Sequence, residues 1–251
     1  MIRFSVILSC VFFVGISAVY AQSSARKNTE EKRLSRSEIV RLERSLEQFT
    51  GYYDEALRAI RSGSKKFDYD VSRLRHYYPK TDHYSPFAQS VIDDMTEYAY
   101  IADTSEDKEE SNNALIAYRN LLSLHMANLD VVTFALRMSR VDERLGDEVF
   151  LKRVRSALLK VVLYDGHECD KPELACSIAS YGEENYILGR IGGVVKHSEI
   201  YNVSSRYYNV HDLIKDGREI QVYIDVTEPI VNVNKLQSVL QQGSGLTVLP
   251  Q

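Results

Sequence analysis

The chain has 251 residues, and its 35 acidic and 31 basic side chains leave a formal net charge of −4. No excess of positive charge is available to neutralise phosphate groups, so the composition argues against nucleic-acid binding. The length suffices for a sizeable core in one or two domains.

Residues 1–21 have the order of a secretory signal peptide. Arg3 gives a positive start, residues 7–16 are apolar, and small residues lead up to Ala21. The apolar run is shorter than the ~20 residues that a membrane span needs, which disfavours an uncleaved anchor. We expect cleavage before Gln22 and export to the periplasm or the medium. No later segment is apolar enough to predict a membrane span.

Residues 22–34 are polar and charged, and we expect a flexible tether there. A helical region is predicted over residues 35–165. Its first helix starts at Ser35-Arg36-Ser37-Glu38, which has the form of a capping box, and its apolar residues recur at steps of three and four. Ser62-Gly63-Ser64 is predicted to end this helix, with the glycine in the left-handed conformation.

Two shorter helices are predicted next. One lies within residues 67–79 and stops before Pro79. The other starts at Ser85-Pro86, a cap followed by proline in the first turn, and runs to about residue 102. The acidic residues 103–113 are predicted to form a solvated loop.

Three further helices are predicted over residues 114–126, 131–145 and 148–163, where apolar residues recur at helical spacing. Asn128-Leu129-Asp130 and Leu145-Gly146-Asp147 are predicted to be the turns between them. Helices joined by such short turns pack as antiparallel hairpins. The two turns also resemble those of one tetratricopeptide unit. A single copy predicts a helical hairpin and not an array, which needs about three units.

A small β-rich region packed on the helices is predicted over residues 166–242. Residues 219–226 alternate between apolar and polar side chains, which is typical of a strand with one buried face. Asp216-Gly217 directly before this strand predicts a hairpin turn. Helices first and strands afterwards indicate an α+β chain whose sheet is small and antiparallel.

The rest of this region is less regular. Residues 201–214 are predicted to be extended, and residues 186–195 are predicted to be a strand with a bend at its glycines. Pro229 is expected to end the sheet. A closing helix is predicted over residues 234–241, and a loose tail over residues 243–251.

Two cysteines remain after cleavage, Cys169 and Cys176. An even pair in an exported chain predicts a disulfide. The alternative is a metal site completed by Asp165 and His167. It is disfavoured because six residues separate the two cysteines, against the two to four that are typical of zinc ligands. No metal or other cofactor is therefore expected.

Two groups of side chains are candidates for a site. The binding candidates His76, Tyr77, Tyr78, His83 and Tyr84 place two imidazoles and three phenols within nine residues, which could line a pocket or bind a cation. The alternative is that these rings pack a loop against the helices.

The second group consists of acidic residues near a histidine: Asp165, His167, Glu168, Glu183 and Glu184. Carboxylates near an imidazole can perform acid–base chemistry if they converge in space. The alternative is a solvated loop held by the disulfide.

Three short motifs lie along residues 67–240: Leu74-Arg75-His76-Tyr77, Tyr84-Ser85-Pro86 and Tyr223-Ile224-Asp225-Val226. Together they resemble the bacterial family called domain of unknown function 4919, with Ile224 in the place of an aromatic residue. The resemblance implies a secreted bacterial protein. It implies no catalytic residues, because the family has no established activity.

The sequence contains no serine elbow, no phosphate-binding glycine loop and no two-histidine zinc motif, so no catalytic residue is assigned. We therefore expect a non-enzymatic binding or structural protein of the cell envelope or the secreted fraction, whose partner is another such protein. The alternative is an exported hydrolase acting on cell-wall or polysaccharide material, because a catalytic carboxylate pair needs no contiguous motif.

Overall fold

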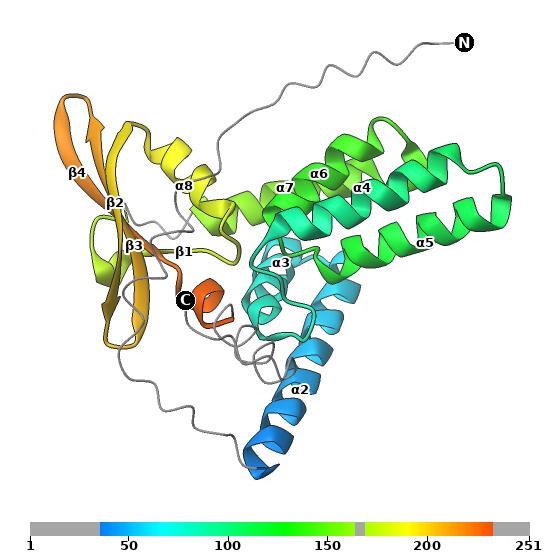
Figure 1. Cartoon of the computed structure of the whole chain (residues 1–251), viewed down its shortest axis with the longest axis horizontal. Coiled ribbons are helices and arrows are strands. Elements are labelled where there is room, and N and C mark those ends of the chain that lie inside the picture. The colour runs from blue at the N-terminus through cyan, green and yellow to red at the C-terminus, as the bar shows by residue number, and fades with distance from the viewer. Residues whose placement is uncertain (1–35, 164–168, 233–251) are drawn as a thin grey trace, which may run out of the picture. The chain divides into compact units, whose positions relative to one another are not determined.

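The computed structural model describes residues 36–163 and 169–232 and has the predicted α+β class. Helices fill the described chain up to Leu163, and a four-stranded sheet follows (Figure 1). Contacts divide the chain into the units Met1–Leu42 and Glu43–Gln251, and the second unit contains the sheet and every helix after the first. The predictions for the signal peptide, the tether, the closing helix and the tail lie outside the described residues.

The first helix, α2 (Arg36–Arg61), ends where glycine was predicted to end it. Gly63 has a φ of 76°, a left-handed conformation that costs glycine little because it has no Cβ. Helix α3 (Phe67–Tyr77) follows and continues into the short 3₁₀ helix η1 (Tyr78–Lys80). Pro79 lies in η1, so the prediction that the α-helix stops before this proline is confirmed.

The next two helices correct two predictions. Helix α4 (Ala88–Thr104) begins after Phe87, and Ser85 does not cap it, because the Ser85 hydroxyl donates to the Phe87 carbonyl. Helix α5 (Lys108–Leu124) begins inside the acidic run that was predicted to be a loop. The Asp107 side chain accepts a hydrogen bond from the Glu109 N–H (2.8 Å), and the acidic first turn is favourable at a helix N-terminus.

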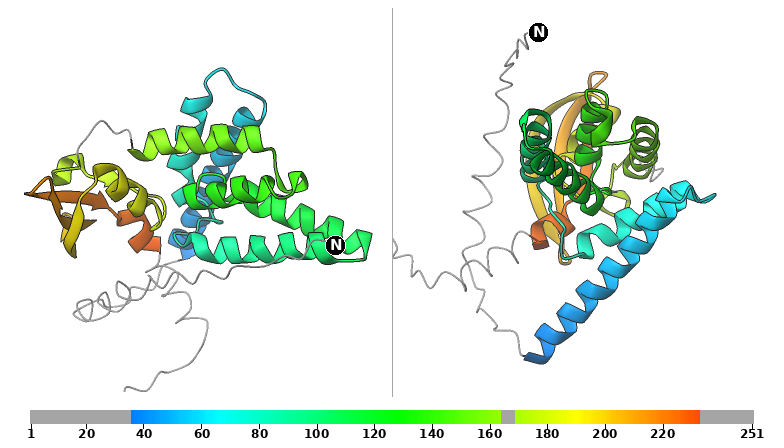
Figure 2. Two further views of the ribbon diagram at one scale, coloured as in Figure 1. Left: turned by 90° about the horizontal axis from the view of Figure 1, so that it is seen from above. Right: turned by 90° about the vertical axis from the view of Figure 1, so that its right-hand side faces the viewer.

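Helices α4 and α5 lie side by side in the views of Figures 1 and 2. Helix α6 (Leu129–Ser139) starts at its predicted cap, since the Asn128 Oδ1 accepts from the Asp130 N–H at 3.0 Å. It ends six residues earlier than predicted, because the chain then turns into η2 (Glu143–Leu145). Helix α7 (Glu148–Leu163) has the predicted bounds and packs against α6 and α3.

The sheet is mixed, whereas an antiparallel sheet was predicted. Its strands are β1 (Cys176–Ser177), β2 (Val194–Val203), β3 (Arg206–Lys215) and β4 (Arg218–Asp225), in the order β1-β4-β3-β2. Strands β2, β3 and β4 pair antiparallel, as predicted. The short β1, which follows the 3₁₀ helix η3 (Pro172–Leu174), pairs parallel with β4.

Of the less regular predictions for this region, one is wrong and one is confirmed only in part. A helix, α8 (Glu183–Ile191), occupies most of the predicted strand 186–195. It ends at Gly192 and Gly193, which both have positive φ, and a Cβ on Gly193 would approach the Ile214 carbonyl oxygen to 2.7 Å. The stretch 201–214, which was predicted to be extended throughout, is interrupted by the turn between β2 and β3. The two turn residues, Ser204 and Ser205, adopt the left-handed conformation.

The last hairpin confirms the sequence pattern. Gly217 has a φ of 74° in the turn between β3 and β4. Val222, Ile224 and Val226 lie on the buried face of β4 and are at most 1% exposed. The sheet ends at Asp225, ahead of Pro229, and residues 227–232 are helical, because proline is tolerated in the first turn of a helix.

A disulfide joins Cys169 to Cys176, as predicted, with a Cα–Cα distance of 5.3 Å. The backbone beside it is fixed to the sheet, because the Tyr223 N–H donates to the Cys169 carbonyl (2.6 Å). Within residues 36–163 and 169–232, no helix combines the length and the apolar character that crossing a bilayer requires.

Replacing both Cys169 and Cys176 by serine is expected to lower the free energy of unfolding by roughly 2.5 kcal/mol, because the unfolded chain regains the entropy of a short open loop. Urea unfolding measures the change, and reduced wild-type protein is the control and should lose the same amount. Intact mass should rise by two hydrogens on reduction. Two free thiols in the unreduced protein would contradict the cross-link.

Candidate functional site

The predicted group of histidines and tyrosines divides between the interior and the surface. Tyr78 is fully buried, Tyr84 is 7% exposed, and His83 is half-buried beside them. His76 is exposed at the end of α3, and Tyr77 beside it is half-buried and packs against the edge of the core. The five residues therefore do not line one continuous site, and their binding role remains a prediction.

The inner members are held by hydrogen bonds and ring contacts. The Tyr78 hydroxyl lies 2.7 Å from His125 Nδ1, and the Tyr84 hydroxyl donates to the Ala179 carbonyl (2.8 Å). The Tyr78 and Tyr84 rings meet edge to face, with centroids 5.1 Å apart. Burial raises the pKa of both tyrosines. Burial, with the neighbouring His83, lowers the pKa of His125 to about 4, so this cluster is uncharged at neutral pH.

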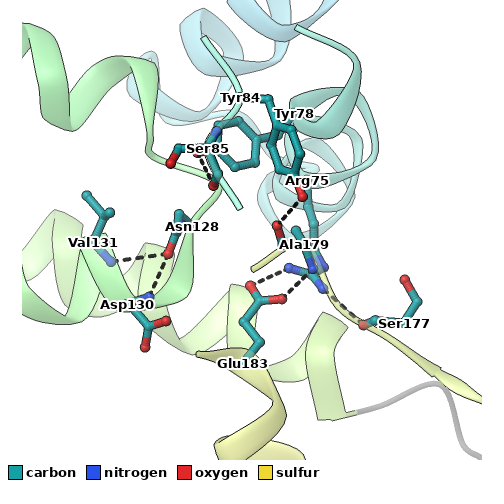
Figure 3. A network of polar contacts seen from close by, with 10 residues as sticks. All are labelled: Arg75, Tyr78, Tyr84, Ser85, Asn128, Asp130, Val131, Ser177, Ala179 and Glu183. Atoms are coloured by element: carbon teal, nitrogen blue, oxygen red, sulfur yellow. Dashed lines mark hydrogen bonds and ion pairs between the residues drawn. The ribbon is translucent and has the colours of Figure 1, made fainter. Parts of the chain in front are cut away.

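A buried ion pair lies next to this cluster (Figure 3). Arg75 on α3 approaches the Glu183 carboxylate at the start of α8, with 2.5 Å between its guanidinium nitrogen and Oε1. The other carboxylate oxygen accepts from the Ala179 N–H (2.7 Å), and Arg75 also donates to the Ser177 carbonyl (3.1 Å). Glu183 is fully buried. This network joins the helical region to β1 and α8 and has a structural role.

Tyr77 belongs to an aromatic surface patch, which consists of Phe49, Tyr52 and Tyr77. The Tyr52 and Tyr77 rings have centroids 5.2 Å apart, and Phe49 lies 6.3 Å from each of them. The Lys80 ammonium lies 5.4 Å from the Phe49 centroid, and the Arg73 guanidinium lies 6.0 Å from that of Tyr77. These contacts are cation–π pairs within the protein itself.

An open pocket of about 400 Å³ lies in the helical region, and none of the candidate site residues predicted from the sequence lines it. Its walls come from the end of α2, from α5, from η2 and from the first turns of α7. Its apolar lining consists of Leu122, Met126, Leu145, Phe150 and Leu151. Its basic lining consists of Arg61, Arg119 and Arg144. We call it the arginine pocket.

The three guanidinium groups differ in the polar groups that they contact. Arg144 is paired with Asp142 (2.7 Å), which raises the pKa of Arg144. Arg119 donates twice to the Arg144 carbonyl (3.1 and 2.6 Å), and Arg61 donates to the Ser123 hydroxyl. Among the described residues, neither Arg61 nor Arg119 forms an ion pair with a carboxylate. Two guanidinium groups at the pocket are therefore able to bind an anion.

Two acidic residues, Glu143 and Asp147, also line the arginine pocket. Asp147 acts as the cap of α7, because its Oδ1 accepts from the Phe150 N–H at 3.0 Å. The N-terminus of a helix stabilises the carboxylate that caps it. The arrangement therefore suits a ligand with one negative group beside Arg61 and Arg119 and an apolar part on the pocket floor.

Sequence reasoning missed the arginine pocket, because its basic residues stand on the charged faces of predicted helices, where arginine is normally just solvated. The second predicted group is only partly described, since Asp165, His167 and Glu168 lie outside the described residues. Glu183 belongs to the buried ion pair, and Glu184 contacts His211 on β3 at 2.6 Å. The described residues contain no group of three or more potential metal ligands.

Three comparisons with known proteins were made, and no family model, no curated protein and no solved structure matches the chain. The resemblance to domain of unknown function 4919 therefore stays an expectation.

Proposed function

We propose that this protein is an exported binding protein of the cell envelope or the secreted fraction, and that it holds an anionic ligand in the arginine pocket. The observation that carries the proposal is the pair Arg61 and Arg119, two guanidinium groups that form no direct ion pair with a carboxylate among the described residues, beside apolar lining residues. The disulfide and the signal-like N-terminus support export.

The charge and shape of the pocket support a class of ligand. A guanidinium fork matches the geometry of carboxylate and phosphate groups, and its charge-assisted hydrogen bonds are stronger than neutral ones. The apolar floor favours a ligand that buries hydrocarbon next to its charged group. The proposed ligand is a carboxylate or phosphate with an apolar portion, carried by another envelope or secreted component.

The test is isothermal titration of the mature protein with octanoate, with its neutral counterpart octanol and with inorganic phosphate. We expect octanoate to bind at least about tenfold more tightly than octanol, because a charge-assisted hydrogen bond contributes about 1.5–3 kcal/mol. The double variant Arg61→Gln with Arg119→Gln should lose at least about tenfold in octanoate affinity.

Two matched variants sharpen this test. Arg137→Gln removes an exposed arginine on α6 that does not line the pocket, and octanoate affinity should stay unchanged. Glu143→Gln removes a negative charge from the pocket wall and should strengthen octanoate binding. Equal binding of octanoate by the wild type and the double arginine variant would contradict the proposal, and so would the absence of binding.

The alternative, a hydrolase with a pair of carboxylates, is supported by the presence of Glu143 and Asp147 in the same pocket. A catalytic pair needs both carboxylates available to substrate and water. The hydrogen bond from the Phe150 N–H commits Asp147 to capping α7, so the geometry favours binding.

A further inference from the structure

A serine, a histidine and a glutamate meet at the outer part of the sheet, away from the arginine pocket. Ser198 on β2 and His211 on β3 are direct cross-strand partners, and the Ser198 Oγ lies 2.7 Å from His211 Nδ1. The other ring nitrogen, Nε2, lies 2.6 Å from Glu184 Oε1, which comes from the first turn of α8. The order hydroxyl, imidazole, carboxylate is that of an activated serine nucleophile.

The surroundings fix the histidine and leave the serine accessible. His211 is 3% exposed, whereas Ser198 is exposed on the edge strand β2. The Asn209 amide donates to the same Glu184 oxygen (2.8 Å), so the carboxylate is held from a second side. With the ring proton on Nε2, the positive end of that N–H dipole lies beside the Glu184 carboxylate, and Nδ1 is then the acceptor for the Ser198 hydroxyl.

The contact between Nε2 and Glu184 is short but too bent to be a hydrogen bond. It still places the Glu184 carboxylate against the side of the ring opposite Ser198, where it restricts the orientation of the imidazole. Glu184 is therefore a positioning residue that acts through His211.

From this geometry we propose that Ser198 is an acylatable nucleophile, with His211 as its general base, which hydrolyses small carboxylic esters. The inference goes beyond the binding function and does not depend on the arginine pocket. It also differs from the hydrolase expected from the sequence, which relied on two carboxylates. Ile200, two residues along the same strand face and 47% exposed, favours an apolar acyl group.

In the proposed reaction, the Ser198 Oγ forms a bond to the ester carbonyl carbon while its proton passes to His211 Nδ1. The carbon–oxygen bond to the alcohol then breaks, and the imidazolium returns that proton to the departing alkoxide. Water attacks the acyl group with His211 again taking a proton. That proton goes back to the Ser198 Oγ as the serine–acyl bond breaks, which regenerates the site.

The test combines covalent labelling with turnover in the mature protein. A fluorophosphonate probe should label Ser198, as identified by peptide mass analysis, and p-nitrophenyl butyrate should be hydrolysed. Ser198→Ala should abolish the label and reduce hydrolysis to that of the wild-type protein after complete reaction with the probe. His211→Asn should slow labelling by at least about 100-fold, in line with the usual contribution of a general base.

The protein carries its own control in Ser156, an exposed serine on α7 whose hydroxyl donates to the Lys152 carbonyl and not to an imidazole. Ser156 should remain unlabelled, and Ser156→Ala should behave like the wild type. Circular dichroism identifies any variant that fails to fold, and Ser198→Ala changes only an exposed hydroxyl. Equal labelling of Ser198 and Ser156 would overturn the proposal. Hydrolysis that survives in Ser198→Ala but disappears in His211→Asn would also overturn it, because the imidazole would then be the nucleophile.

The role of Glu184 needs a readout that a purely structural role would not move. Glu184→Gln keeps the size of the side chain but removes its charge from beside His211. Labelling of Ser198 should therefore slow in Glu184→Gln, but adding Glu184→Gln to His211→Asn should cause no further slowing, because Glu184 acts through His211. Equal slowing in the wild-type and His211→Asn backgrounds would reject the positioning role of Glu184.

Discussion

Replacing Glu183 by glutamine is expected to lower the free energy of unfolding by about 3–5 kcal/mol. The change leaves the Arg75 guanidinium buried beside a neutral amide, and an uncompensated buried charge is strongly destabilising. The network in Figure 3 also connects α3 to β1 and α8, so the substitution should destabilise both the helical region and the β-rich region. Urea unfolding followed by circular dichroism measures it.

Two further variants separate burial from charge. Lys160→Ala breaks the exposed ion pair with Asp68 and should change the stability by less than about 1 kcal/mol. Arg75→Met together with Glu183→Leu removes both buried charges and should recover much of the stability lost in Glu183→Gln. If Glu183→Gln and Lys160→Ala had equal effects, the buried pair would not have the structural role assigned to it.

Acidification from pH 7 to pH 4 is expected to remove about 3 kcal/mol of stability through His125. Burial, and secondarily His83, lowers the pKa of His125 from 6.5 to about 4 in the folded protein. In that pH range the unfolded chain binds the proton and the folded protein does not, so the free energy of unfolding rises with pH. The stabilisation is fully present above about pH 6.5 and is lost as the pH falls towards 4.

The variant His125→Gln tests this assignment, because glutamine does not titrate and still offers an acceptor to the Tyr78 hydroxyl, which lies 2.7 Å from His125. Its unfolding free energy should depend less steeply on pH between 4 and 6.5. Some dependence should remain, because burial also lowers the pKa of His83. A variant with the full wild-type pH dependence would show that other groups are responsible.

Local sequence signals placed most of the elements correctly. Gly63 ends α2, Asn128 caps α6, and the turn at Gly217 joins β3 to β4, because each of these signals acts within a few neighbouring residues. The wrong predictions also concern short stretches of sequence. The acidic residues 103–113 predict a solvated loop, although Asp107 provides the cap that lets α5 begin within them.

The candidate sites could not be predicted in this way. Arg61, Arg119 and Arg144 come from three separate elements, and each of them alone has the pattern of a solvated helix surface. Ser198 and His211 face each other only because of the register between β2 and β3, and the hairpin between these strands was itself missed.

The sequence alone determined the α+β order of the chain, the caps and turns of several helices, and the pairing of Cys169 with Cys176. Only the tertiary structure decided which polar groups meet. Arg75 and Glu183 are 108 residues apart, and their charges are tolerated in the interior only because packing brings them together. Periodicity and capping are properties of short windows of sequence, whereas a site requires side chains from distant windows to converge, and this is decided by how the helices and the sheet pack.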